Sequence, residues 1–213
     1  MNQLSPIDKC LMEIDFAIRT LMPPKHRLAK RINPGKSFDE PSLSAKEKRH
    51  VAGLMRVNHA GEVCAQALYK GQAITAKLTT VKEQMCAAAA EETDHLAWCE
   101  ERLQELSNHP SYLNPMWYFG SLMLGAMAGL IGDEWSLGFV EETERQVTHH
   151  LEKHLTQLPP KDSKSQAILM QMKEDEAHHA EVAHRAGAHP LPFLIKQLMH
   201  KVSKLMTQSS YYI

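Results

Sequence analysis

A short pattern that occurs twice, a Glu followed three residues later by a His, constrains the fold of this chain more than any other feature. Residues three apart on an α-helix share one face, so each pair can direct a carboxylate and an imidazole at one point. Each pair also has a further Glu thirty to thirty-two residues upstream, which gives Glu62, Glu92 and His95 in the first half and Glu144, Glu176 and His179 in the second. Four Glu and two His from four helices are the ligand set of a carboxylate-bridged di-iron or di-manganese centre in a bundle core.

Helix signals place these residues on four long helices. Ser44 and Glu47 form a capping box that begins a helix running to about residue 77. Thr80 is the expected N-cap of a second helix to about residue 106. A third helix is expected to continue after Asp133-Glu134 to about residue 158. A fourth runs from residue 162 or 163 to about residue 188. No β alternation of useful length is present.

The sequence therefore predicts an all-α fold, a ferritin-like four-helix bundle with a di-iron core, as one domain over residues 1–213. Residues 1–43 are expected to form an amphipathic helix that ends at Pro23-Pro24, followed by a linker. The bundle is expected over 44–188, and an amphipathic tail over 189–213 with a helix at about 192–207.

The chemistry of the donor set favours iron. Four carboxylates can neutralise two divalent cations in a core, and one His per metal suits Fe(II). Oxygen-rich ligation without thiolates argues against zinc and iron–sulfur centres. Candidates for orienting the ligand imidazoles are Asp94, Asp175 and His150. A solvated, salt-bridged helix face is the alternative reading of one such pair, and periodicity alone does not choose between Glu141 and Glu144.

Residues 116–132 form a second unusual feature, a stretch of seventeen residues without a charge. That length is short of the roughly twenty residues that span a bilayer. The segment could be a buried bundle helix or a spanning helix, but we favour one that dips into one leaflet, aided by the basic amphipathic helix at 192–207. An apolar entrance of this kind would admit a lipid-soluble substrate.

Composition excludes several other classes of protein. The formal net charge is −1, so no broad basic surface indicates a nucleic-acid partner. The four cysteines lack Cys-x-x-Cys spacing and are expected to be reduced thiols. The first residues lack the basic and apolar regions of a secretory signal.

Longer stretches around the motifs are similar to those of one known family. Residues 56–69, Arg-Val-Asn-His-Ala-Gly-Glu-Val-Cys-Ala-Gln-Ala-Leu-Tyr, resemble the first-helix signature of the demethoxyubiquinone hydroxylase family. So do the segments around Glu92-x-x-His95 and Asp175-Glu176-x-x-His179, and residues 138–151 resemble the third-helix ligand region of its bacterial members. The resemblance covers nearly the whole chain. It implies that the iron ligands are Glu62, Glu92, His95, Glu144, Glu176 and His179, and so prefers Glu144 to Glu141.

The resemblance also implies an activity. Members of the family are O₂-dependent di-iron monooxygenases with two Fe ions (Fe²⁺/Fe³⁺), and they hydroxylate the quinol ring of a polyprenylated demethoxyubiquinol in ubiquinone biosynthesis. The expected location is peripheral, on the cytoplasmic side of a bacterial cell membrane, with other ubiquinone-biosynthesis proteins as partners. A rubrerythrin-like iron oxidase or an iron-storage protein is the alternative; the former usually needs a Cys₄ site, which this chain lacks.

Overall fold

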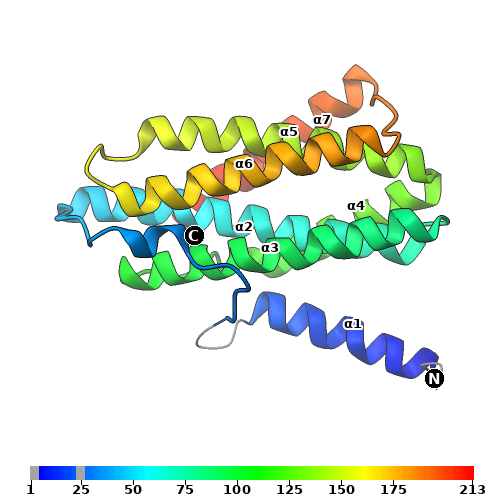
Figure 1. Cartoon of the computed structure of the whole chain (residues 1–213), viewed down its shortest axis with the longest axis horizontal. Coiled ribbons are helices and arrows are strands. Elements are labelled where there is room, and N and C mark those ends of the chain that lie inside the picture. Colours follow the sequence, from blue (N-terminus) through cyan, green and yellow to red (C-terminus); the bar gives the residue numbers. More distant parts are fainter. Residues whose placement is uncertain (1–4, 23–26) are drawn as a thin grey trace.

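Helices make up almost all of the secondary structure in the computed structural model, which describes residues 5–22 and 27–213 (Figure 1). No strand occurs in those two ranges, which confirms the predicted all-α class. The elements are α1 (Pro6–Leu21), a 3₁₀ turn η1 (Pro34–Ser37), α2 (Ala45–Thr75), α3 (Thr79–Glu105), α4 (Asn114–Ile131), α5 (Asp133–Gln157), α6 (Ser163–Arg185) and α7 (Phe193–Tyr212). The predicted helix end at Pro23-Pro24 lies outside the described residues.

Four of these helices form the bundle core. α2 packs on α3 and α5 packs on α6, and each pair is antiparallel because only a short loop joins its members. Figure 1 shows the α5–α6 pair lying over the α2–α3 pair. The two Glu-x-x-His motifs lie on α3 and α6, and the two upstream Glu residues lie on α2 and α5. The ferritin-like arrangement is therefore present, with all four motif-bearing helices facing one core.

Local signals explain where α2 and α3 begin. The Ser44 hydroxyl accepts from the Glu47 N–H while the Glu47 carboxylate accepts from the Ser44 N–H, so the predicted capping box is confirmed. The predicted Thr80 cap of α3 is wrong, because that helix begins at Thr79 and no side chain caps it. Instead, the Asp133 carboxylate at the start of α5 accepts from the backbone N–H groups of Lys77 and Leu78, the two residues that precede α3.

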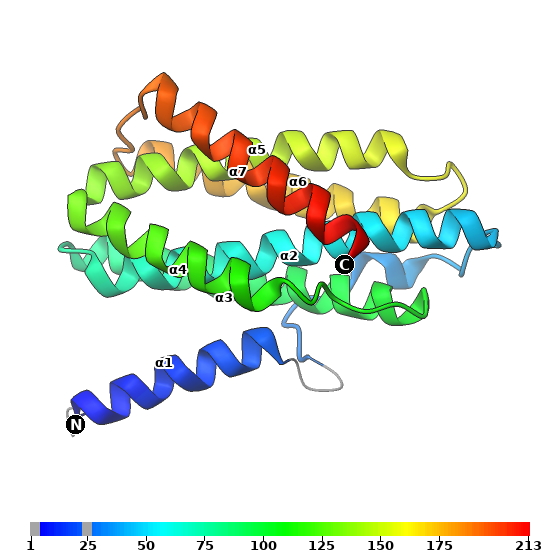
Figure 2. The same cartoon turned by 180° about the vertical axis from the view of Figure 1, so that it is seen from behind.

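The uncharged segment forms α4, which packs along α2. Glycines allow this close approach, since a Cβ at Gly125 would lie 2.2 Å from the Leu68 carbonyl oxygen and one at Gly71 would lie 2.2 Å from that of Leu122. The opposite face of α4 remains exposed and carries Met116, Phe119, Met123, Met127 and Leu130. Figure 2 shows α4 on the outside of α2. None of the described helices has the length and apolar character needed to cross a bilayer.

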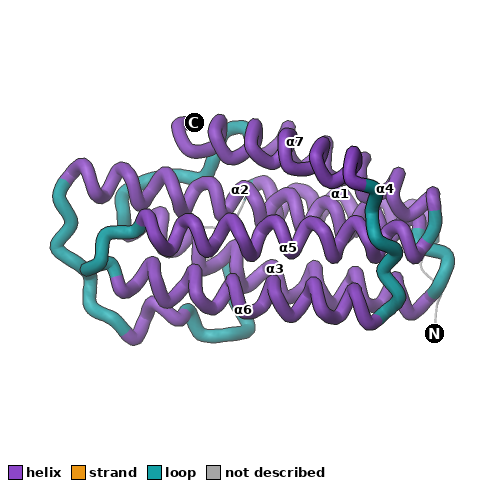
Figure 3. The backbone as a smooth tube through the Cα atoms, turned by 90° about the horizontal axis from the view of Figure 1, so that it is seen from above, coloured by secondary structure: helices purple, strands orange, loops and turns teal. Residues whose placement is uncertain are grey.

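The terminal helices lie on the outside of the bundle. α1 begins at a Ser5 cap, and its apolar stripe of Ile7, Leu11, Ile14 and Ile18 is exposed. α7 runs across α2 and α5 (Figure 3). It ends five residues later than predicted because Tyr211 packs over Gly53, where a Cβ would lie 2.6 Å from the Tyr211 ring, and Arg56 donates to the Tyr211 carbonyl. α6 ends at Arg185, before the expected residue 188.

Candidate metal centre

The six predicted ligand residues meet in one buried cluster at the centre of the bundle. Their ligand-type atoms form two overlapping groups in which the atoms lie within 4.8 Å of one another. The first group is Glu62, Glu92, His95 and Glu176, and the second is Glu144, Glu176 and His179. All six side chains are buried, and α2, α3, α5 and α6 each supply at least one. The bundle thus brings together every candidate from the repeated pattern.

Two carboxylates lie between the two imidazoles. Glu92 places one oxygen 2.8 Å from His95 Nδ1 and the other 3.2 Å from His179 Nδ1. Glu176 likewise lies 3.2 Å from each of these two nitrogens. Glu62 approaches only the first imidazole, with an oxygen 3.5 Å from His95 Nδ1, and Glu144 lies with the second. Glu92 and Glu176 would therefore suit a position between two metals, and Glu62 and Glu144 a position on one metal each.

The outer nitrogens of the two imidazoles are paired crosswise. His95 Nε2 lies 2.8 Å from an Asp175 oxygen, and His179 Nε2 lies 2.8 Å from a Glu91 oxygen. Each of these acids directly precedes the Glu of the opposite motif. A carboxylate on Nε2 holds a proton there, so Nδ1 is the nitrogen that faces the cluster and is the one available to a metal. Asp175 was a sequence candidate for this role and Glu91 was missed, although an acidic residue precedes both Glu-x-x-His motifs.

Arg31, in the segment between α1 and η1, supports the first half of the cluster. Its guanidinium lies 2.8 Å from Asp175 and 3.0 Å from Asp94, and its carbon is 4.9 Å from the centre of the Trp98 ring. Asp94 also accepts from the backbone N–H groups of Lys30 and Arg31. The sequence candidate Asp94 therefore acts on this segment rather than directly on an imidazole. No sequence pattern indicated Arg31.

The α5 carboxylate in the cluster is Glu144, to which the Tyr69 hydroxyl donates a hydrogen bond. Glu141, the alternative that periodicity left open, instead pairs near the surface with Arg145 and with His184. Tyr69 is fully buried on α2, two turns after Glu62, and was not recognised from the sequence. The structure thus places Glu144 and a phenol donor together on the second half of the site.

His150, a candidate for orienting a ligand, lies elsewhere. Its ring packs against that of His154, with centroids 3.9 Å apart, and its Nε2 is buried without a hydrogen-bond partner among the described residues. His154 in turn pairs through Nδ1 with the Asn58 side-chain oxygen at 2.9 Å. His150 and Glu144 both lie on α5, but about two helical turns separate them, and the His150 imidazole does not join the cluster.

The protein's own charges make the cluster a site for cations. Burial and then repulsion from Glu92 raise the pKa of Glu62 well above its usual value, and burial with repulsion from Glu176 raises that of Glu144. Burial opposes charge on His179 as well, but hydrogen bonds to Glu176 and Glu92 raise its pKa to about 12. The carboxylates repel one another in this buried core, so a cation held between them would be stabilised.

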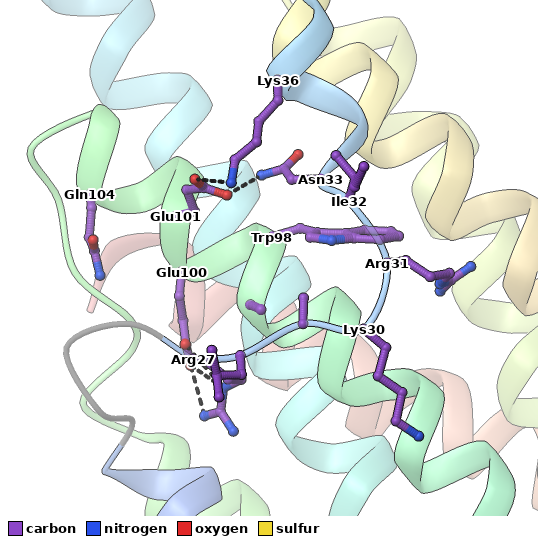
Figure 4. A pocket seen from close by; sticks show the side chains of 13 residues that line it. Arg27, Lys30, Arg31, Ile32, Asn33, Lys36, Trp98, Glu100, Glu101 and Gln104 are labelled. Atoms are coloured by element: carbon purple, nitrogen blue, oxygen red, sulfur yellow. Dashed lines mark hydrogen bonds and ion pairs between the residues drawn. The ribbon is translucent and has the colours of Figure 1, made fainter.

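A surface cavity of about 350 Å³ lies outside the cluster, between residues 27–36 and α3 (Figure 4). Trp98 forms one wall, and Arg27 pairs with Glu100 at 2.9 Å inside it. This wall is linked to the cluster through Arg31, which lies over the Trp98 ring and pairs with Asp175, the partner of His95. None of the six cluster residues lines this cavity, so it is separate from the candidate centre.

The donor set fits a pair of hard or borderline divalent cations. Six buried carboxylate and imidazole groups converge without a thiolate, and no Lys or Arg side chain of the described residues forms an ion pair with the four Glu. The fold and this cluster define a ferritin-like helical bundle with a buried carboxylate–histidine cluster able to bind metal.

The comparisons with known proteins narrow this class. The family model described as "Ubiquinone biosynthesis protein COQ7" matches residues 49–210. A relative from Legionella pneumophila named 3-demethoxyubiquinol 3-hydroxylase is 63% identical over 213 residues, which is 100% of both chains. A protein of the same name from Acinetobacter baumannii is 54% identical over 213 residues, which is 100% of both chains. Another from Chromobacterium violaceum is 53% identical over 207 residues, which is 97% of this chain and 100% of the relative. The chain belongs to the family of ubiquinone biosynthesis protein COQ7.

Proposed function

We propose that this chain is a 3-demethoxyubiquinol 3-hydroxylase, which uses O₂ to hydroxylate the quinol ring of a polyprenylated demethoxyubiquinol. The observation that carries the proposal is the buried cluster of four Glu and two His, in a chain that full-length relatives of that name match over their whole length. Such a cluster is suited to bind the metals of an oxygen-activating centre.

Two iron ions are the proposed cofactor. Glu62 and His95 would hold one ion, Glu144 and His179 the other, and Glu92 and Glu176 would lie between them, following the two overlapping groups. When bound, the iron pair would supply O₂ activation and the two electrons that reduce the second oxygen atom to water. Manganese would fit the same oxygen-rich set, so iron specificity is part of the proposal.

Residues around the cluster prepare it for this chemistry. Asp175 and Glu91 fix the protonated nitrogen of each imidazole at Nε2 and leave Nδ1 available to a metal. Tyr69 stays protonated because burial and then the charge of Glu144 raise its pKa well above the usual value. The phenol can therefore keep donating its hydrogen bond to Glu144 at neutral pH.

An exposed apolar surface suits a substrate with a polyprenyl tail. Large apolar side chains are exposed on α1 and α4, and α7 adds Leu194, Leu198 and Leu205. Contiguous apolar patches of this kind mark membrane or protein contacts. The proposed location is peripheral, on the cytoplasmic side of a bacterial cell membrane, where other ubiquinone-biosynthesis proteins would be partners.

Complementation tests the activity. A bacterial strain that lacks its own hydroxylase and accumulates demethoxyubiquinone should make ubiquinone when it expresses this chain, as measured by mass spectrometry of quinone extracts. The Glu176→Ala chain should restore none, whereas Glu174→Ala, two residues away on the exposed face of α6, should restore full production. If the unaltered chain is expressed in soluble or membrane fractions and the demethoxy intermediate persists, the assignment fails.

Vesicle flotation tests the membrane contact separately. A Leu198→Glu/Leu205→Glu chain should float less with phospholipid vesicles than the unaltered chain, because both side chains are exposed on α7. A Gln157→Glu chain adds a charge at an exposed position at the end of α5, outside α7, and should float normally. Equal flotation of all three chains would contradict contact through α7.

A further inference from the structure

A basic cavity of about 260 Å³ between α5 and α7 has no role in the proposed chemistry. The basic side chains that line it are His149, His150 and Lys153 from α5, and His200 and Lys204 from α7. Gln146 and the hydroxyls of Ser203 and Thr207 complete the lining. No carboxylate of the described residues lines this cavity, although the chain as a whole carries a net charge of −1.

The two lysines of this cavity are not neutralised by any described acid. Lys153, Lys204 and His200 form no ion pair with any described residue. Of the lining groups, His149 has an acidic neighbour, Glu152 at 3.6 Å, whereas Glu142 pairs at 2.9 Å with Lys196, which does not line the cavity. Two helices distant in sequence therefore bring Lys153 and Lys204 to one concavity, where no described carboxylate pairs with either ammonium group.

The inner wall adds a buried group that also lacks a partner. His150 Nε2 is buried and has no hydrogen-bond partner within residues 5–22 and 27–213, while its ring rests on His154. Most buried polar atoms in folded proteins are paired, so an unpaired ring nitrogen on the wall of a basic cavity points to a ligand that approaches it. Burial, with the positive neighbours Lys153 and His149, lowers the pKa of His150 to about 4. Burial is the larger cause, and the smaller contribution of Lys153 and His149 is a positive potential at the ring that a bound anion would relieve.

We propose that the cavity between α5 and α7 binds a phosphate-bearing anion. Lysine ammonium groups, imidazole N–H groups and hydroxyls are the donors that recognise phosphate oxygens, and both helices contribute them. The source of the phosphate is either a soluble ester or the headgroup of an anionic lipid. α7 could serve a headgroup because its exposed apolar stripe runs along the same helix, on the side away from His200 and Lys204.

Binding measurements on the full-length chain test the proposal. One variant, Lys153→Gln/Lys204→Gln, removes two charges from the cavity; its matched control, Lys173→Gln/Lys201→Gln, removes two charges from α6 and α7 outside it. The soluble probe is pyrophosphate in isothermal titration calorimetry. The lipid probe is sedimentation with phosphatidylcholine vesicles, with and without phosphatidylglycerol, at one fixed salt concentration.

A phosphate site predicts that the cavity variant binds at least one probe about tenfold or more weakly, which is the loss expected when charge-assisted contacts are removed. The control variant should differ from the unaltered chain by less than about twofold. Loss of pyrophosphate binding identifies a soluble ester, whereas selective loss of binding to the phosphatidylglycerol vesicles identifies a lipid headgroup. If neither probe binds the unaltered chain, or if both variants lose binding equally, the cavity is a solvated basic surface and the proposal is wrong.

Discussion

Replacing Asp175 by Ala should weaken metal binding while leaving all six cluster residues in place. Asp175 is the acceptor on His95 Nε2 at 2.8 Å, and its side chain is only 15% exposed. Burial works against ionisation of this carboxyl, yet hydrogen bonds from His95 and Arg31 hold its pKa below the usual value. It is therefore charged at neutral pH and keeps the proton of His95 on the outer nitrogen.

The magnitude follows from burial, and Glu91 provides the comparison. Loss of a partner that orients a metal-bound imidazole typically weakens metal affinity 10- to 100-fold, or about 1.4–2.7 kcal/mol. We expect Asp175→Ala to fall in that range. Glu91 has the same role and the same 2.8 Å distance to His179, but its side chain is 54% exposed. Exposed pairs contribute only about 0–1 kcal/mol, so Glu91→Ala should weaken binding no more than about fivefold.

The assay is anaerobic competition for Fe(II) between metal-free protein and a coloured chelator of known affinity. Thermal unfolding of each metal-free variant, followed by circular dichroism, controls for loss of the fold. Asp175→Asn is a third variant, since its amide oxygen can still accept from His95, and it should retain more affinity than the alanine chain. An affinity of Asp175→Ala within about twofold of the unaltered chain would refute the reasoning. A larger loss in Glu91→Ala than in Asp175→Ala would also refute it.

Two other predictions concern stability. Gly125→Ala should destabilise the fold by about 3 kcal/mol, because the added Cβ would lie 2.2 Å from the Leu68 carbonyl oxygen. Gly120→Ala has open space at its Cβ and should change stability by no more than about 1 kcal/mol. Equal midpoints of urea unfolding for the two chains would contradict the packing of α4 on α2. Burial lowers the pKa of His154 to about 3, below the unfolded value of about 6.5, so the unfolded chain binds the extra proton and stability falls as pH drops below about 6.5. Between pH 7 and pH 5 this one residue should cost about 2 kcal/mol, and urea unfolding of His154→Gln at both pH values should show a correspondingly smaller loss.

The sequence predicts the core of the candidate site but leaves one register undecided. The spacing of three between Glu and His fixes which face of α3 and α6 points inward. On α5 no His accompanies the Glu, and Glu141 and Glu144 share a helical face, so local periodicity cannot separate them. The difference is tertiary: α2 lies against α5 and presents Tyr69 to Glu144, while Glu141 lies where Arg145 and His184 can reach it. Only the similarity to a known family, or the packed bundle, could make that choice.

Residues around the cluster depend on contacts that no local pattern encodes. Arg31 belongs to an irregular segment before the bundle, outside the residues 49–210 that the family model matches. Its place over Trp98 results from the path of the chain between α1 and α2, which helix periodicity does not describe. Glu91 was within reach of pattern analysis, because an acid precedes both motifs. The sequence could not show that each acid serves the imidazole of the other motif, since that requires the spatial relation of α3 to α6.

The crosswise pairing has a consequence for how the two halves of the site depend on each other. His95 on α3 is oriented by Asp175 on α6, and His179 on α6 is oriented by Glu91 on α3. Neither imidazole is therefore positioned by its own helix alone, and a small shift of α3 against α6 would disturb both at once. The two carboxylates that lie between the imidazoles come from the same two helices, so the same contact sets the spacing of the candidate metals. Because ligands that bind only the folded state stabilise it, metal binding should strengthen the α3–α6 contact as a unit. Occupation of one half of the site would in this way prepare the other half.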